Sequence, residues 1–126
     1  MNKQQTGKKA REDGYKAEGF AALFLRLKGY KILERNFKPP RGSGAGEIDI
    51  IACKHGILVF VEVKRRSTLD TAAETVNPTV QARRIRGAEY FLMTHPDWNG
   101  KEMRFDVVLI APGKLPEHIQ NAFICE

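Results

Sequence analysis

The sequence predicts an α/β fold: a sandwich in which helices flank a mixed central sheet. Segments 46–52 and 58–64 alternate with period two, as half-buried strands do. Segments 9–28 and 78–94 carry apolar residues at helical spacing instead. The resulting order is helix, three strands, helix, then one or two strands, and this mixture of elements favours a layered α/β domain.

Composition limits the class of protein. The 126 residues suffice for one domain, expected to span 1–126, with one core. No apolar run approaches the roughly 18–20 residues of a membrane span, and the N-terminus lacks the apolar region of a signal peptide. We therefore expect no membrane partner and a cytoplasmic location. Cys53 and Cys125 lack metal-ligand spacing and are interpreted as free thiols of a reducing compartment.

The first element is predicted to be a helix over 9–28, after a flexible basic leader at 1–8. Its apolar stripe is predicted to be Ala17, Phe20, Ala21, Phe24 and Leu27, and Gly29 gives a stop signal. Glu18 belongs to a flanking row with Ala22 and Leu25, at the edge of the buried face. The pattern alone leaves open whether Glu18 is a solvated helix residue or part of a site.

A strand is predicted over 30–37, and an irregular segment follows it at 38–46. Two prolines and three glycines among those nine residues exclude regular structure. We interpret 38–46 as a flexible connecting loop, although Lys38 and Arg41 would also suit contact with phosphate. No phosphate-loop motif follows.

The central prediction is a hairpin formed by segments 46–52 and 58–64. His55-Gly56 suits a two-residue turn, because both residue types tolerate positive φ. Lys54 then pairs with Ile57, so Asp49 lies opposite Glu62 and Glu47 opposite Lys64. Strand alternation places these four charged side chains on one face, with Ile48 and Ile50 on the other.

This register would place two carboxylates side by side. Opposed Cβ atoms are roughly 5 Å apart, and like charges there repel by about 3 kcal/mol at an effective dielectric of 20. A divalent cation would offset the repulsion, since Mg²⁺ accepts one or two carboxylates and completes its shell with water and phosphate. Lys64 would lie beside that metal. The alternative is the solvated outer face of a hairpin, with Glu47 and Lys64 as a surface pair.

Basic residues follow the hairpin. Arg65 and Arg66 end the second strand, and Arg83, Arg84 and Arg86 lie on a helix predicted over 78–94. Such arginines are either solvated or in contact with a nucleic-acid backbone. The net charge of +6 favours a polyanionic partner.

The last predicted elements are strands over 103–111 and 119–124. Asp106 in the first is either a supporting partner of the acidic site or an ion-pair partner of Arg104. The three histidines, His55, His95 and His118, lack mutual metal-ligand spacing and are assigned no chemistry.

Several strings together resemble a known family. Asp49 followed by Glu62-Val63-Lys64 resembles the D…(E)xK signature of the PD-(D/E)XK nuclease superfamily. The full set resembles the YraN-like family of small bacterial proteins, described as predicted endonucleases related to archaeal Holliday-junction resolvases. The strings that carry this resemblance are 17–18, 29–33, 35–36, 46–52, 59–65 and 104–108. The chain departs from the family pattern at Ala17, at Val80 and in a longer 38–46 loop.

The resemblance implies a restriction-endonuclease-like fold and a DNA-cleaving activity dependent on Mg²⁺ or Mn²⁺. Asp49 and Glu62 would hold the metal, Lys64 would act on the scissile phosphate, and Glu18 would complete the catalytic set. The basic residues expected to bind nucleic acid are Arg41, Arg65, Arg66, Arg83, Arg84 and Arg86. DNA would be selected by structure, and analogy with resolvases implies a homodimer. The alternatives are a non-catalytic nucleic-acid-binding module of the same fold and a small interaction protein whose charge serves solubility.

Overall fold

The computed structural model describes residues 16–65 and 78–123. Within them, five strands form one sheet in the spatial order β1-β2-β3-β4-β5. Pairing is antiparallel except between β3 and β4, so the sheet is mixed, as predicted. The strands are β1 Lys31–Phe37, β2 Ile48–Lys54, β3 Ile57–Arg65, β4 Met103–Ile110 and β5 Glu117–Phe123.

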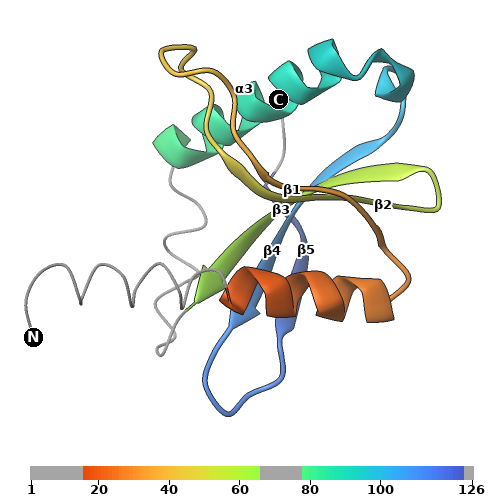
Figure 1. The fold of residues 1–126 in the computed structure, drawn as a ribbon, viewed down its shortest axis with the longest axis vertical. Coiled ribbons are helices and arrows are strands. Elements are labelled where there is room, and N and C mark those ends of the chain that lie inside the picture. The colour runs from red at the N-terminus through yellow and green to blue at the C-terminus, as the bar shows by residue number, and fades with distance from the viewer. Residues whose placement is uncertain (1–15, 66–77, 124–126) are drawn as a thin grey trace, which may run out of the picture.

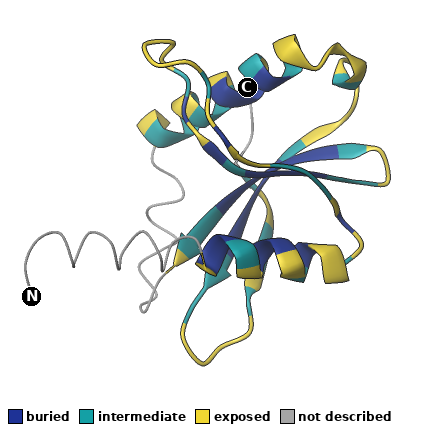
Figure 2. Ribbon diagram, viewed as in Figure 1, coloured by how far each residue is buried: buried dark blue, intermediate teal, exposed yellow. Residues whose placement is uncertain are grey.

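Two helices cover opposite faces of this sheet (Figure 1). The N-terminal helix, described over 16–27, packs on one face, and α3 (Pro78–Thr94) lies across the other. Dark residues in Figure 2 concentrate where the strands cross between the helices. The N-terminal-helix side of the core includes Ala21, Leu25, Ile50, Val59, Val61 and Val108, and the α3 side includes Ile51, Leu58, Phe60, Ala88, Phe91 and Phe105. The predicted α/β sandwich is therefore confirmed.

The hairpin forms with the predicted turn. His55 and Gly56 have φ of 53° and 78°, the positive values that a two-residue hairpin turn requires. Lys54 pairs with Ile57, and the same register continues to Ile50 opposite Val61. In β3, Leu58 and Phe60 pack on the α3 side, whereas alternate valines pack on the other side, as strand parity predicts.

The predicted faces of β2 are wrong at its start. Ile48 packs with Ile51 on the α3 side, while Ile50 packs on the N-terminal-helix side. Alternation is therefore broken around Asp49. The reason lies just before the strand, where Gly46 is anchored to α3: its amide donates a hydrogen bond to the carbonyl of Arg83 at 2.8 Å.

The buried row of the N-terminal helix also differs from the prediction. Phe20 and Leu27 are 51% and 79% exposed, whereas Glu18, Ala22 and Leu25 are buried. Small residues at 21 and 22 let the helix lie close to the sheet, which rotates the bulkier Phe20 outward. The row interpreted as flanking is thus part of the packed face, and Gly29, with φ of 94°, follows the helix end as expected.

Segment 38–46 lies against α3. Gly87 makes this possible because it has no Cβ. A Cβ at this position would clash with the Gly46 carbonyl oxygen. Arg86 Nη1 also donates a hydrogen bond to the Gly44 carbonyl at 3.2 Å. The expected flexibility of this segment stays a prediction, and the leader at 1–8 lies outside the described residues.

The remaining elements follow the predicted order closely. The short η1 helix (Pro96–Trp98) links α3 to β4, and β5 begins two residues earlier than predicted, as an edge strand. Within residues 16–65 and 78–123, no helix is long and apolar enough to cross a membrane.

Candidate functional site

The candidate site lies where β2 and β3 stop pairing. Their ladder ends at Ile50–Val61, one step before Asp49 and Glu62. Asp49 Oδ2 instead accepts a hydrogen bond from the amide of Val63 at 2.8 Å. The Asp49 side chain thus takes the place of a backbone carbonyl as the acceptor for this β3 amide. The predicted pairing of Asp49 with Glu62 is therefore corrected. Glu47 precedes β2 altogether, so its predicted pairing with Lys64 does not form either.

Glu62 is buried on the α3 side and carries two cationic partners. Its Oε1 lies 2.7 Å from Lys64 Nζ and 2.5 Å from Arg84 Nη2. Only 4% of the Glu62 side chain is exposed, so these ion pairs are largely shielded from water. Lys64 comes from the same strand, as predicted. Arg84 comes from α3, and the structure places it on the carboxylate rather than on an outer surface.

Asp49 is half-buried, and burial raises the pKa of its carboxyl above the ordinary value. The Val63 hydrogen bond and the charge of Arg84 oppose that shift, while the negative charge of Glu62 adds to it. Asp49 and Glu62 thus act on each other electrostatically despite their missing ladder pair. The two carboxylates therefore still repel each other, which was the reason for expecting a cation at this position.

Glu18 joins this site from the N-terminal helix. Burial raises the pKa of the Glu18 carboxyl, and the nearby charge of Asp49 raises it further. Arg35 on β1 counteracts this, with its Nε 3.3 Å from Glu18 Oε1. The interpretation of Glu18 as a solvated helix residue is therefore wrong. It is a buried carboxylate within the electrostatic reach of Asp49.

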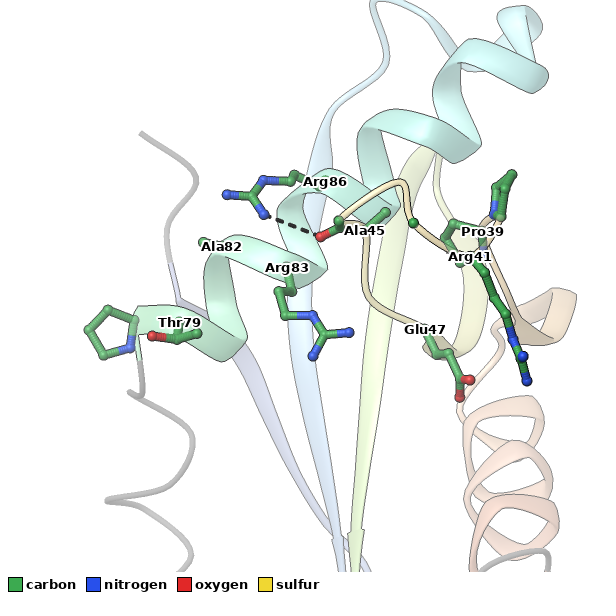
Figure 3. Close-up of a pocket in the computed structure, with 12 residues that line it drawn as sticks. Pro39, Arg41, Ala45, Glu47, Thr79, Ala82, Arg83 and Arg86 are labelled. Atoms are coloured by element: carbon green, nitrogen blue, oxygen red, sulfur yellow. Dashed lines mark hydrogen bonds between the residues drawn. The ribbon is translucent and has the colours of Figure 1, made fainter.

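Asp49 and Glu47 border an open pocket of about 310 Å³. Asp49, Glu47, Gly46, Val80, Arg83 and Arg84 line it. A second pocket of about 790 Å³ shares Glu47 and Arg83 with the first and extends to Arg41 and Arg86. Figure 3 shows Arg83 extending from α3 toward the side that carries Glu47 and Arg41. Four of the six predicted basic residues thus line this continuous concavity.

One of the other two predicted basic residues lies away from both pockets. Arg65 is exposed at the end of β3 and lines neither pocket. Arg66 lies outside the described residues.

These side chains suit a magnesium or manganese ion. Carboxylate oxygens are the ligands both ions prefer, and Mg²⁺ commonly takes only one or two of them. Within residues 16–65 and 78–123, no group of three His, Cys, Asp or Glu side chains is gathered closely enough to hold a metal. The predicted ligand set is the pair Asp49 and Glu62, which would hold the ion without a third such side chain. Glu62 already pairs with Lys64 and Arg84, so a metal bound there would meet both cations at short range.

Asp106 belongs to a different cluster, on the N-terminal-helix side of the sheet. Arg104 donates to both of its carboxylate oxygens at 2.8 Å, and His118 Nε2 lies 2.7 Å from Oδ2. The amide of Asn121 donates to Oδ1 at 2.9 Å. Burial alone would raise the pKa of Asp106, but these bonds outweigh it and lower the pKa. Of the two interpretations of Asp106, the structure supports the ion pair with Arg104.

With this geometry established, comparison with known proteins places the chain in a family. The model of the uncharacterised protein family UPF0102 matches residues 17–110. The chain belongs to the UPF0102 family. This is the YraN-like group that the sequence resembles, so that resemblance is confirmed.

Individual UPF0102 relatives align over most of the chain. A UPF0102 protein of Paramagnetospirillum magneticum is 49% identical over 114 residues, covering 90% of this chain and 88% of the relative. One from Bradyrhizobium sp. (strain ORS 278) is 49% identical over 110 residues, covering 87% and 75%. One from Rhodopseudomonas palustris (strain HaA2) is 49% identical over 112 residues, covering 89% and 84%.

Sequence reasoning missed three contributions in this UPF0102 chain. The pairing of Arg84 with Glu62 was not expected, and its contact with nucleic acid stays a prediction. Arg35 was assigned no role but holds Glu18. His118 was assigned no chemistry but bridges Asp106 and Lys28, whose Nζ lies 2.6 Å from His118 Nδ1. Spacing along the chain carries no signal for these pairs, because each joins residues from different elements.

Proposed function

We propose that this UPF0102 protein hydrolyses phosphodiester bonds in DNA in a metal-dependent reaction. The observation that carries the proposal is that Asp49 lines an open pocket with Arg83 and Arg84 and lies within the electrostatic reach of the Glu62–Lys64 ion pair. Clustered carboxylates alone would repel a nucleic acid. A metal held by Asp49 and Glu62, together with the neighbouring cations, would turn the repulsion into attraction.

The residues have distinct roles in this proposal. Asp49 and Glu62 would hold Mg²⁺ or Mn²⁺, which supplies an acidified water molecule and a polarised phosphate when bound. Lys64, whose Nζ already lies beside the Glu62 carboxylate, would offset negative charge that develops on the phosphate in the transition state. Glu18 would hold a proton or a water molecule from the N-terminal-helix side, consistent with its raised pKa.

Recognition would rest on the phosphate backbone. Arg41, Arg83 and Arg86 line the larger pocket beside the acidic residues. Contacts of arginine with phosphate position a nucleic acid without reading its sequence. We therefore propose selection of DNA by structure, with branched or nicked DNA as the substrates to try first. A homodimer, the arrangement implied by resolvase-like relatives, would present two such sites.

The decisive experiment is a cleavage assay with purified protein on branched, nicked and linear DNA, with Mg²⁺, with Mn²⁺ and with EDTA. We expect cleavage only with metal, and its loss in Glu62→Ala and Lys64→Ala. Lys114→Ala is the matched control, because Lys114 is exposed in the β4–β5 loop. Cleavage that persists in both site variants would overturn the proposal. Sedimentation analysis of the same samples tests the homodimer.

A second function has one observation in its favour. Lys64 and Arg84 already neutralise Glu62, so the carboxylate has charged partners without any metal. A nucleic-acid-binding module that does not cleave would retain such a site for stability. DNA binding that depends on salt, ignores metal and survives Asp49→Ala, with no turnover on any of the substrates, would favour this function.

A further inference from the structure

Arg84 occupies a position that the proposed hydrolysis does not explain by itself. It lies on α3, yet its guanidinium Nη2 contacts the buried Oε1 of Glu62 at 2.5 Å. Lys64 contacts the same oxygen at 2.7 Å. A divalent cation that binds Glu62 must therefore approach two positive charges at short range, which weakens its binding.

Arg84 also faces the pocket. It lines the 310 Å³ pocket together with Asp49 and Arg83, so one side chain borders both the Glu62 carboxylate and the space proposed for phosphate. Its positive charge also acts on Asp49, the second proposed metal ligand. The planar guanidinium pairs with phosphate as readily as with carboxylate. A rotation of the side chain would exchange one anion for the other.

We propose that Arg84 is a displaceable counterion that couples metal binding to phosphate binding. This inference rests on the proposed function of the site. Without phosphate, Arg84 pairs with Glu62 and competes with the metal. A phosphodiester in the pocket attracts Arg84, which frees Glu62 to bind the metal. By linkage, each ligand then strengthens the binding of the other by the same factor.

The counterion role predicts opposite effects of one substitution on two measurements. In Arg84→Gln, Mn²⁺ meets one positive charge fewer, so it should bind about tenfold more tightly, within the range usual for coupled sites. Cleavage and DNA affinity should fall, because the phosphate loses a partner. A residue that serves only the structure would weaken both measurements together, as would a residue that helps to hold the metal.

The test is calorimetric titration of Mn²⁺ into the metal-free protein, which needs no activity. Arg83→Gln is the matched control: it removes the same charge from the neighbouring position and lines the same pocket, but Glu62 pairs with Arg84. We expect tighter binding in Arg84→Gln and a change below about twofold in Arg83→Gln. Arg84→Lys retains the charge and should remain close to the wild type.

A second titration uses the wild type alone and covers the case in which Arg84→Gln fails to fold. Mn²⁺ is titrated with and without dimethyl phosphate, a singly charged phosphodiester. Tighter Mn²⁺ binding in the presence of dimethyl phosphate supports the coupling. The gain in Mn²⁺ affinity should be smaller in Arg84→Gln than in the wild type. Unchanged Mn²⁺ affinity in the wild type, or weaker Mn²⁺ binding in a folded Arg84→Gln, overturns the counterion role while leaving hydrolysis intact. Absence of Mn²⁺ binding in every variant overturns both proposals.

Discussion

The Asp49 carboxylate accepts a hydrogen bond from the backbone amide of Val63, in place of the backbone pairing that a continued β2–β3 ladder would make. The 2.8 Å hydrogen bond to Oδ2 holds the carboxylate between the two strands, at the point where they separate. The site therefore lies where the β2–β3 ladder ends. Glu18 reaches it from the N-terminal-helix side, and Glu62 with Arg84 reaches it from the α3 side.

The first prediction concerns the pH dependence of stability. Because the pKa of Asp49 is raised in the folded state above 3.8, the folded protein holds this proton more tightly than the unfolded chain. Its contribution to the free energy of unfolding is present below pH 3.8 and is lost as pH rises through the folded pKa. Asp49→Asn keeps an acceptor for the Val63 amide and should be more stable than the wild type at neutral pH.

Urea unfolding of both proteins from pH 4 to 8, without metal, measures this difference. Asp97→Asn removes one exposed carboxylate from η1 and is the control for a general change in net charge. A wild type that is as stable as Asp49→Asn across the whole range would contradict the raised pKa.

The second prediction concerns salt. Arg83→Gln and Arg86→Gln each remove one cation from the larger pocket. If each arginine contacts one phosphate, the slope of log K against log salt should decrease in magnitude by about one per variant. Fluorescence anisotropy with a labelled nicked duplex gives the slope. Lys101→Gln, an exposed lysine before β4, should leave it unchanged. Equal slopes in all four proteins would remove both arginines from the proposed interface.

The third prediction separates stability from the site. Asp106 is 1% exposed and carries Arg104 and His118 as partners. Asp106→Asn leaves the guanidinium without its charged partner, which should cost about 3–5 kcal/mol of the free energy of unfolding. Because the pKa of Asp106 is lowered, this contribution is present above pH 3.8 and is lost as pH falls through the folded value.

Denaturant unfolding at neutral pH measures the cost. Glu117→Gln is the control, because Glu117 is an exposed residue of β5. Mn²⁺ affinity of the folded fraction should not change, since Asp106 pairs with Arg104 and His118 and lies outside the Asp49 pocket. A loss below about 1 kcal/mol would mean that Asn satisfies the same partners.

The fourth prediction compares two helical glycines. A Cβ at Gly87 would collide with the Gly46 carbonyl, whereas a Cβ at Gly19 would meet only Arg35 Nη2 at an ordinary 3.6 Å. Gly87→Ala should therefore destabilise the protein by about 1–3 kcal/mol by pushing 38–46 off α3. Gly19→Ala should stabilise it by roughly 0.5–1 kcal/mol through helix propensity. Melting of both variants tests the pair, and the same sign in both would refute the close approach of Gly46 to α3.

Local signals along the chain determined a large part of this structure. His55-Gly56 set the turn and, through it, the register up to Ile50–Val61, because a two-residue turn leaves no freedom in pairing. Helical spacing and Pro78 predicted α3 with the bounds that it has. Parity placed Glu62 and Lys64 on one side of β3, and they are an ion pair.

Only the tertiary structure decided how the acidic residues meet. Alternation assumes a regular strand, but Gly46 docks on α3 and the β2–β3 ladder ends before Asp49, so a carboxylate expected on one face bonds to the neighbouring strand. Arg84 and Glu62 are 22 positions apart in sequence (84 − 62) and meet only because α3 packs on the sheet. Periodicity predicts which face of an element is buried. It does not predict which residues pack against that face, since these come from elements distant in the chain.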